Sequence, residues 1–141
     1  MKTNNDFVAV AKEYAARGWS VIPVGVNKKP AVGMWKEYQK RMMSEGELNV
    51  LFWGPQHTGL AVVTGEISNL IVLDCEAEAD LSLLKDMPHT LMSKSGGGGR
   101  HYFFKKPKNV VVPRRIKFMP EMDLLGEGSY AILPPSGHPS G

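Results

Sequence analysis

The sequence has few of the features that mark secreted and membrane proteins. Its 141 residues include one cysteine, Cys75, which excludes an internal disulfide and disfavours a zinc site built on thiolates. No apolar stretch approaches the roughly 20 residues that a membrane-spanning helix needs. Residues 1–6 lead into an amphipathic helix pattern and lack the apolar core and cleavage site of a signal peptide. We therefore expect a cytoplasmic protein without a membrane partner.

Acidic residues are missing from one long segment, residues 100–117. The net charge is only +3, but this segment holds basic residues and no acid: Arg100, Lys105, Lys106, Lys108, Arg114, Arg115 and Lys117. It could follow a nucleic-acid backbone, with Tyr102 and Phe118 available for stacking, or it could be a solvated loop. A second basic group could do the same, and the sequence does not choose between the two: Lys28, Lys29, Lys36, Lys40 and Arg41.

The length and the spacing of apolar residues indicate one α/β domain over residues 1–141. The pattern predicts helices over 6–17, 35–41, 45–53 and 77–85, and strands over 19–24, 59–64, 70–75, 101–104 and 130–133. A short turn-like link between 59–64 and 70–75 suggests that these two strands form a hairpin. The chain stops just after a Pro-Pro-Ser turn, so it could also be a trimmed piece of a longer protein.

Two acids one residue apart, Asp74 and Glu76, follow the apolar run 70–73. Side chains at i and i+2 of a strand leave the same face, so both carboxylates are expected to point into one small volume. Cys75 is then expected to face the opposite, buried side. A third acid, Asp123, precedes Leu124 and Leu125; taken alone, such an acid is most often a solvated turn residue. Together the three are hard oxygen ligands suited to Mg²⁺ or Mn²⁺.

A glycine run, 96–99, lies between Ser95 and the pair Arg100-His101. Consecutive glycines let backbone amides approach an anion, so this loop could hold a phosphate chain. The alternative is a flexible hairpin loop without a binding role. It is not a nucleotide-binding P-loop, because neither Lys-Ser nor Lys-Thr follows the glycines. We predict phosphate contacts from Ser95, Gly97, Gly98, Arg100 and His101.

Six segments, in order, resemble the N-terminal primase/polymerase domain of plasmid, phage and mobile-element replication proteins, a branch of the archaeo-eukaryotic primase superfamily. They are residues 14–23, the Lys28-Lys29-Pro30 loop with Trp35, residues 59–65, Leu73 to Glu76, Ser95 to His101, and residues 126–141. The resemblance implies an α+β fold with an RRM-like catalytic sheet beside a smaller helix-containing N-terminal unit. It also implies that Asp74, Glu76 and Asp123 bind two catalytic metal ions and that His101 contacts the triphosphate of the incoming nucleotide.

Three functional hypotheses follow. The first is a template-directed DNA or RNA primase-polymerase that uses two Mg²⁺ or Mn²⁺ ions, nucleoside triphosphates and a single-stranded DNA template, alone or with a helicase domain or subunit. Its nucleic-acid contacts are expected from Lys28, Lys29, Lys105, Lys106, Arg114 and Arg115. The second is a non-catalytic nucleic-acid-binding module of a replication protein. The third, a metal-dependent nuclease, uses the same acids but gives no reason for the histidine of the glycine loop.

Overall fold

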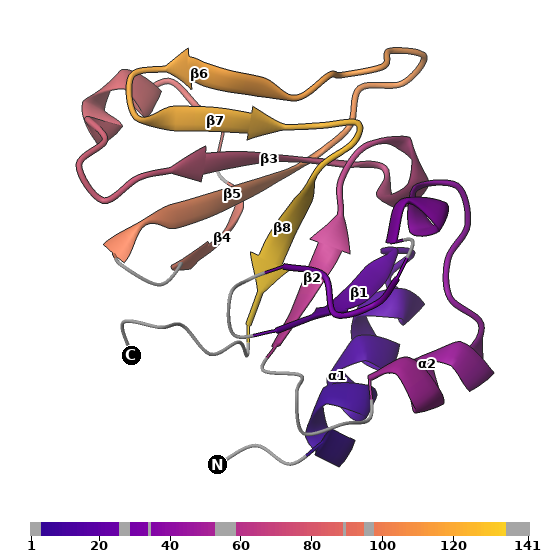
Figure 1. Cartoon of the computed structure of the whole chain (residues 1–141). Coiled ribbons are helices and arrows are strands. Elements are labelled where there is room, and N and C mark those ends of the chain that lie inside the picture. Colours follow the sequence, from indigo (N-terminus) through magenta and orange to yellow (C-terminus); the bar gives the residue numbers. More distant parts are fainter. Residues whose placement is uncertain are drawn as a thin grey trace.

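The computed structural model describes residues 4–25, 29–33, 35–52, 59–88, 90–94 and 98–134, with side chains from Phe7 onward. In this part of the chain, two α-helices and three short 3₁₀ helices accompany two antiparallel sheets, one of three and one of five strands (Figure 1). The α+β fold class is therefore confirmed. No helix among the described residues is long and apolar enough to cross a bilayer.

The three-stranded sheet has the order β1-β2-β8, with β1 Val21–Val24, β2 Gly59–Val63 and β8 Tyr130–Leu133. Every residue of β1 and β2 is buried. A strand that is buried on both faces reads as a continuous apolar run, which is how residues 59–63 read in the sequence. Helix α1 (Asn4–Ala16) packs on β1 and β2 and also contacts α2 (Glu45–Leu51), so this sheet and both helices form the helix-containing unit (Figure 1).

The five-stranded sheet has the order β4-β5-β3-β7-β6 and provides the setting for the predicted site. Its strands are β3 Leu70–Cys75, β4 Leu91–Lys94, β5 Arg100–Lys105, β6 Arg115–Met119 and β7 Met122–Leu125. Val72, Phe103 and Leu125 on one face join the main core with the three-stranded sheet. On the other face, a small cluster around Leu73 and Cys75 packs against the 3₁₀ helix η3 (Leu81–Leu84).

Strands β2 and β3 do not form the predicted hairpin, because they belong to different sheets. Each is a central strand with two partners: β2 pairs with β1 and β8, and β3 pairs with β5 and β7. The link between them turns through the 3₁₀ helix η2 (Glu66–Ser68) and Asn69, whose φ of 52° is left-handed. Two hydrogen bonds between the backbones of Gly65 and Leu70 form an isolated antiparallel bridge. The chain therefore reverses at this link, but the pairing does not continue between β2 and β3.

The other predictions differ in detail from the structure. The helices predicted over 6–17, 35–41 and 45–53 appear as α1, the 3₁₀ helix η1 (Trp35–Gln39) and α2. The helix predicted over 77–85 is reduced to η3. Asp80 accounts for this, because its carboxylate accepts the backbone N–H of Ser82 and so begins the helix four residues late. The apolar pattern does not predict β4, β6 or β7.

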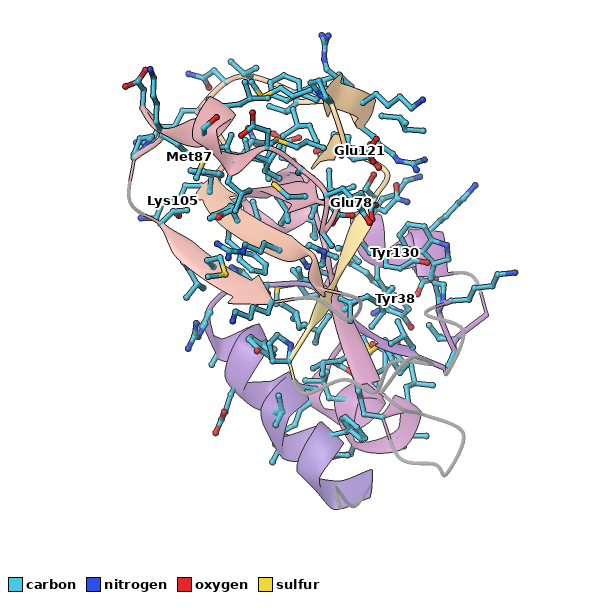
Figure 2. All side chains as sticks on the ribbon, turned by 90° about the vertical axis from the view of Figure 1, so that its left-hand side faces the viewer. Tyr38, Glu78, Met87, Lys105, Glu121 and Tyr130 are labelled. Carbon is cyan, nitrogen blue, oxygen red and sulfur yellow. The ribbon has the colours of Figure 1, made fainter. Side chains whose placement is uncertain are left out.

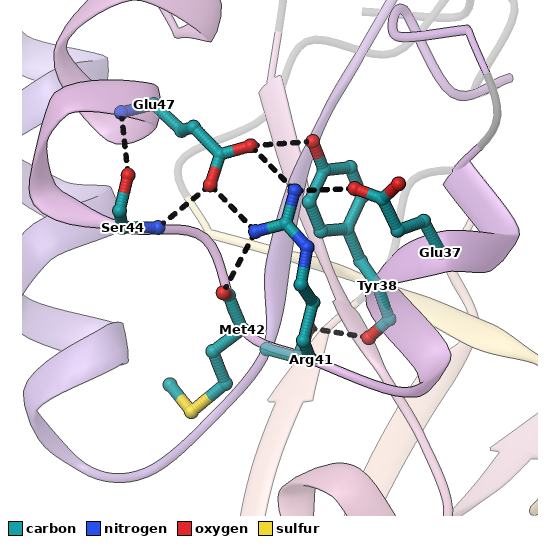
Figure 3. A network of polar contacts seen from close by, with 7 residues as sticks. Glu37, Tyr38, Arg41, Met42, Ser44 and Glu47 are labelled. Atoms are coloured by element: carbon teal, nitrogen blue, oxygen red, sulfur yellow. Dashed lines mark hydrogen bonds and ion pairs between the residues drawn. The ribbon is translucent and has the colours of Figure 1, made fainter.

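Helix α2 begins at a capping box. The Ser44 hydroxyl accepts the N–H of Glu47, and the Glu47 carboxylate accepts the N–H of Ser44 (Figure 3). Arg41 donates to Glu47 and to Glu37, and its guanidinium lies over the Tyr38 ring. The hydrogen bonds from Arg41 and from the Ser44 backbone lower the pKa of Glu47 well below its ordinary range. This exposed network therefore ties η1 to α2, away from the five-stranded sheet.

Candidate active site

Polar side chains form a row across the five-stranded sheet. Asp74 on β3 is the register partner of His101 on β5 on one side and of Asp123 on β7 on the other. Ser93 on β4 is in turn the partner of His101. Directly opposite residues of antiparallel strands share a face, with Cα atoms about 4.5–5.5 Å apart. The structure therefore brings Ser93, His101, Asp74 and Asp123 side by side, in that order.

His101 is fixed between the two sheets. Its Nε2 lies 3.1 Å from Oδ1 of Asp74, and its Nδ1 lies 3.3 Å from the carbonyl oxygen of Ile132 on β8. The side chain is 7% exposed, whereas that of Asp74 is 30% exposed. A ring held on both sides has one orientation, so His101 in turn holds the carboxylate of Asp74 in place.

Aromatic side chains extend this support back to α1. Phe103 meets the His101 ring edge-on, with centroids 6.3 Å apart, and Trp19 stacks on Phe103 at 5.8 Å. Tyr14 of α1 stacks on Trp19 at 5.6 Å, and the Arg17 guanidinium lies over both of these rings. No sequence pattern predicts this chain of contacts. Its members come from a helix, the link after that helix and one strand, and nothing in their spacing shows that they meet.

Asp123 is oriented by the neighbouring edge strand. Its Oδ1 accepts the backbone N–H of Lys117 at 2.8 Å. The pairs Arg115–Leu124 and Met119–Met122 leave residues 116–118 of β6 opposite Asp123 alone, so β6 bulges there. Lys117 has a φ of 55°, in the left-handed region. No sequence signal marks this residue, because the bond comes from its backbone and not from its side chain.

Glu76 lies just beyond the end of β3 and is exposed. Its backbone N–H donates to the carbonyl of Glu121, in the turn between β6 and β7. In the view of Figure 2, Glu121 and Glu78 are labelled on one side of the molecule and Lys105 on the other. Cys75 faces the opposite side of the strand, as predicted; it is buried beside Leu73, and burial raises its pKa to about 11. Within the described residues, no group of three or more His, Cys, Asp and Glu side chains is arranged to hold a metal ion.

The donor chemistry nevertheless suits a divalent cation at Asp74 and Asp123. Two carboxylates facing each other across adjacent strands supply the hard oxygens that Mg²⁺ and Mn²⁺ prefer. In the part of the chain that the structure describes, hydrogen bonds engage only Oδ1 of each carboxylate. The second oxygens of Asp74 and Asp123 would hold the ion, whereas the third ligand role of Glu76 stays a prediction.

Gly98, in the described part of the glycine run, lies at the same end of the sheet. A Cβ placed on Gly98 would lie 3.3 Å from the Cβ of Ala77, the residue after Glu76, and Gly98 has a φ of 89°. Ser95 and Gly97 lie outside the described residues. The register pairs Arg100 with Cys75, so alternation places Arg100 on the face opposite to His101. The structure therefore places Gly98 at the end of β3, and Arg100 on the face opposite to His101.

The predicted nucleic-acid-binding residues are scattered. Lys28 lies outside the described residues, and Lys29 is exposed on the loop after β1. Exposed Lys105 ends β5 opposite Leu70, at the far end of β3 from Asp74. Arg114 and Arg115 are exposed at the start of β6.

Lys106 departs from the prediction of a nucleic-acid contact. It is only 6% exposed, and its ammonium donates to the carbonyls of Pro107 and Val110. The ammonium group is therefore committed to fixing the loop that follows β5.

Comparison with known proteins gives a family. A search of curated proteins found no match for this chain. The family model described as bifunctional DNA primase/polymerase, N-terminal, matches residues 11–141. This match spans both sheets and the whole row from Ser93 to Asp123. The chain therefore belongs to the family of bifunctional DNA primase/polymerase N-terminal domains.

Proposed function

We propose that this domain is a template-directed nucleotidyltransferase, which adds nucleotides from nucleoside triphosphates to a growing DNA or RNA strand. The observation that carries the proposal is the register of β5, β3 and β7, which gives Asp74 both His101 and Asp123 as direct neighbours. Family membership gives primase/polymerase activity as the general class. The row supports a site at which that chemistry takes place.

In this proposal Asp74 and Asp123 hold the divalent ions, with Glu76 as a further ligand at the strand end. Two such ions would activate the attacking hydroxyl and neutralise charge on the triphosphate. The protein contributes orientation: the His101 ring fixes Asp74, and the Lys117 N–H fixes Asp123. Both acids are then held before the ions arrive, which lowers the cost of assembling the site.

The triphosphate lies on the β5 side of Asp74 in this proposal. Gly98 lies at the end of β3, next to Ala77, and backbone amides in a glycine loop suit an anion. His101 is the second residue of β5, and both of its ring nitrogens already have partners, Asp74 and the Ile132 carbonyl. Arg100 faces away, so the proposal assigns the phosphates to the loop amides and keeps His101 as the residue that orients Asp74.

Primer extension and de novo priming by Asp74→Asn test the proposal. Asparagine keeps an acceptor for His101 Nε2 and removes the charge that an ion needs, so the fold should persist. We expect incorporation with Mg²⁺ or Mn²⁺ to fall at least about 100-fold. Asp86→Asn, which neutralises an exposed acid beyond η3, is the matched control and should keep wild-type activity.

Two results would contradict the proposal. Primer extension by Asp74→Asn as fast as by wild type would place the metal site elsewhere. Binding of single-stranded DNA by the wild-type domain, with no incorporation under either ion and either nucleotide set, would favour a non-catalytic DNA-binding module.

A further inference from the structure

The edge strand β6 exposes apolar and basic side chains together. Ile116 is 61% exposed and Phe118 is 50% exposed, although both are large apolar residues. Arg114, Arg115 and Lys117 are exposed beside them. The sheet order leaves one side of β6 without a partner strand among the described residues. Proteins seldom leave such an edge apolar unless something binds there.

The segment leading to β6 is held firmly to the rest of the fold. The carbonyl of Val112 accepts the N–H of Glu127 at 2.7 Å, and Pro113 pairs with Glu127. Gly126 allows this approach, because a Cβ there would lie 2.0 Å from the Val112 oxygen. Lys106 bonds two carbonyls of the preceding loop. The exposed residues of β6 therefore occupy a defined position.

That position adjoins the candidate active site. The Lys117 N–H bonds directly to Asp123, so Ile116 and Phe118 flank the residue that orients this acid. The row across the sheet then has two different ends. Ser93 on β4 lies beyond His101 at one end, and β6 lies beyond Asp123 at the other.

Charge decides which occupant fits this edge. A second copy of the chain, paired edge to edge, would bring Arg114, Arg115 and Lys117 against an identical basic set, which is unfavourable. A single-stranded nucleic acid offers phosphates for these three side chains and base faces for Phe118 and Ile116. Basic side chains interleaved with an aromatic one are the composition of such a binding strip.

We propose that the β6 strip, defined as Arg114, Arg115, Ile116, Lys117 and Phe118, binds single-stranded DNA and delivers it to the Asp123 end of the row. The proposal rests on the proposed function for the identity of this strand as template. It chooses β6 over the other basic group of the sequence, which includes Lys36 and Lys40. Arg41 of that group is already paired with Glu37 and Glu47.

Binding of a fluorescent oligothymidylate, measured by anisotropy over a range of salt without metal or triphosphate, tests the basic part of the strip. Arg114→Ala/Arg115→Ala should reduce the salt slope of the binding constant by about 1.4, since each phosphate contact with a single strand contributes about 0.7. The matched control Lys36→Ala/Lys40→Ala removes the same charge and should keep the wild-type slope. Equal losses in both variants, or none in the first, would overturn the proposal.

Phe118→Ala tests the stacking part in the same assay. We expect affinity to fall at least about fivefold, because base stacking on an aromatic ring contributes that much or more. Leu91→Ala is the control, since Leu91 is 55% exposed on the opposite edge strand, β4. Light scattering supplies a second readout. A wild-type dimer that Phe118→Ala dissociates, with DNA affinity unchanged, would make β6 a contact between chains and would refute the proposal.

Two results separate this proposal from the proposed function. If the wild-type protein binds DNA through β6 but never incorporates a nucleotide, the strip stands and the catalytic role fails. If incorporation depends on Asp74 while the β6 variants bind DNA normally, the catalytic role stands and the strip fails.

Discussion

The two sheets of this domain are built for different tasks. In the three-stranded sheet, β1 and β2 are buried at every residue, and α1 packs against them. The five-stranded sheet carries a polar row through its centre and exposed apolar residues on both edge strands. A sheet that is sealed on both faces can support the fold, whereas one with an accessible end can bind substrates. Stability and chemistry should therefore respond to mutation in different places.

Removal of an aromatic ring from each region gives the largest expected contrast. Phe52 follows α2 and is fully buried in the main core, whereas Phe118 on β6 is 50% exposed. Phe52→Ala should lower the free energy of unfolding by about 3–5 kcal/mol, because it leaves a cavity. Phe118→Ala should change it by less than about 0.5 kcal/mol. Urea unfolding measures both; similar losses would show that β6 is part of the core.

The Arg41 network gives a smaller expected effect, on the stability of the helix-containing unit alone. The pKa of folded Glu47 lies below its ordinary value of 4.5. Glu47 therefore contributes stability that is present above about pH 4.5 and is lost as the pH falls further. Glu47→Gln should make stability fall less steeply with acid. The midpoint temperature of thermal unfolding, measured from pH 6 down to pH 2, checks this. Glu13→Gln on α1 is the control and should keep the wild-type dependence of unfolding temperature on pH. If Glu47→Gln also keeps that dependence, the network does not stabilise α2.

Local signals predicted part of the site from the sequence. The i, i+2 spacing of Asp74 and Glu76 after an apolar run located the end of β3, and alternation placed Cys75 on the buried face. The glycine run predicted a loop before β5. These inferences depend on residues close together in the chain, where the period of a strand is enough to fix which side a residue faces.

Features that depend on the pairing of strands far apart in the chain were not predicted from the sequence. The meeting of Asp74 with Asp123 depends on the register of two strands whose paired residues lie 47 to 53 positions apart in the chain. The apolar pattern of 122–125 is too short to predict a strand. The predicted hairpin of residues 59–64 and 70–75 was wrong because both strands are central and find partners far along the chain. Lys106 looked like its basic neighbours, although its ammonium group is buried on two carbonyls.

Binding of Mn²⁺, followed by loss of the electron paramagnetic resonance signal of the free ion, tests the central claim that acids of β3 and β7 form one site. We expect Asp74→Asn and Asp123→Asn each to weaken binding at least about tenfold, whereas Asp86→Asn should bind like wild type. Wild-type affinity in Asp123→Asn would contradict the account, because the acid that the sheet register places beside Asp74 would then hold no metal.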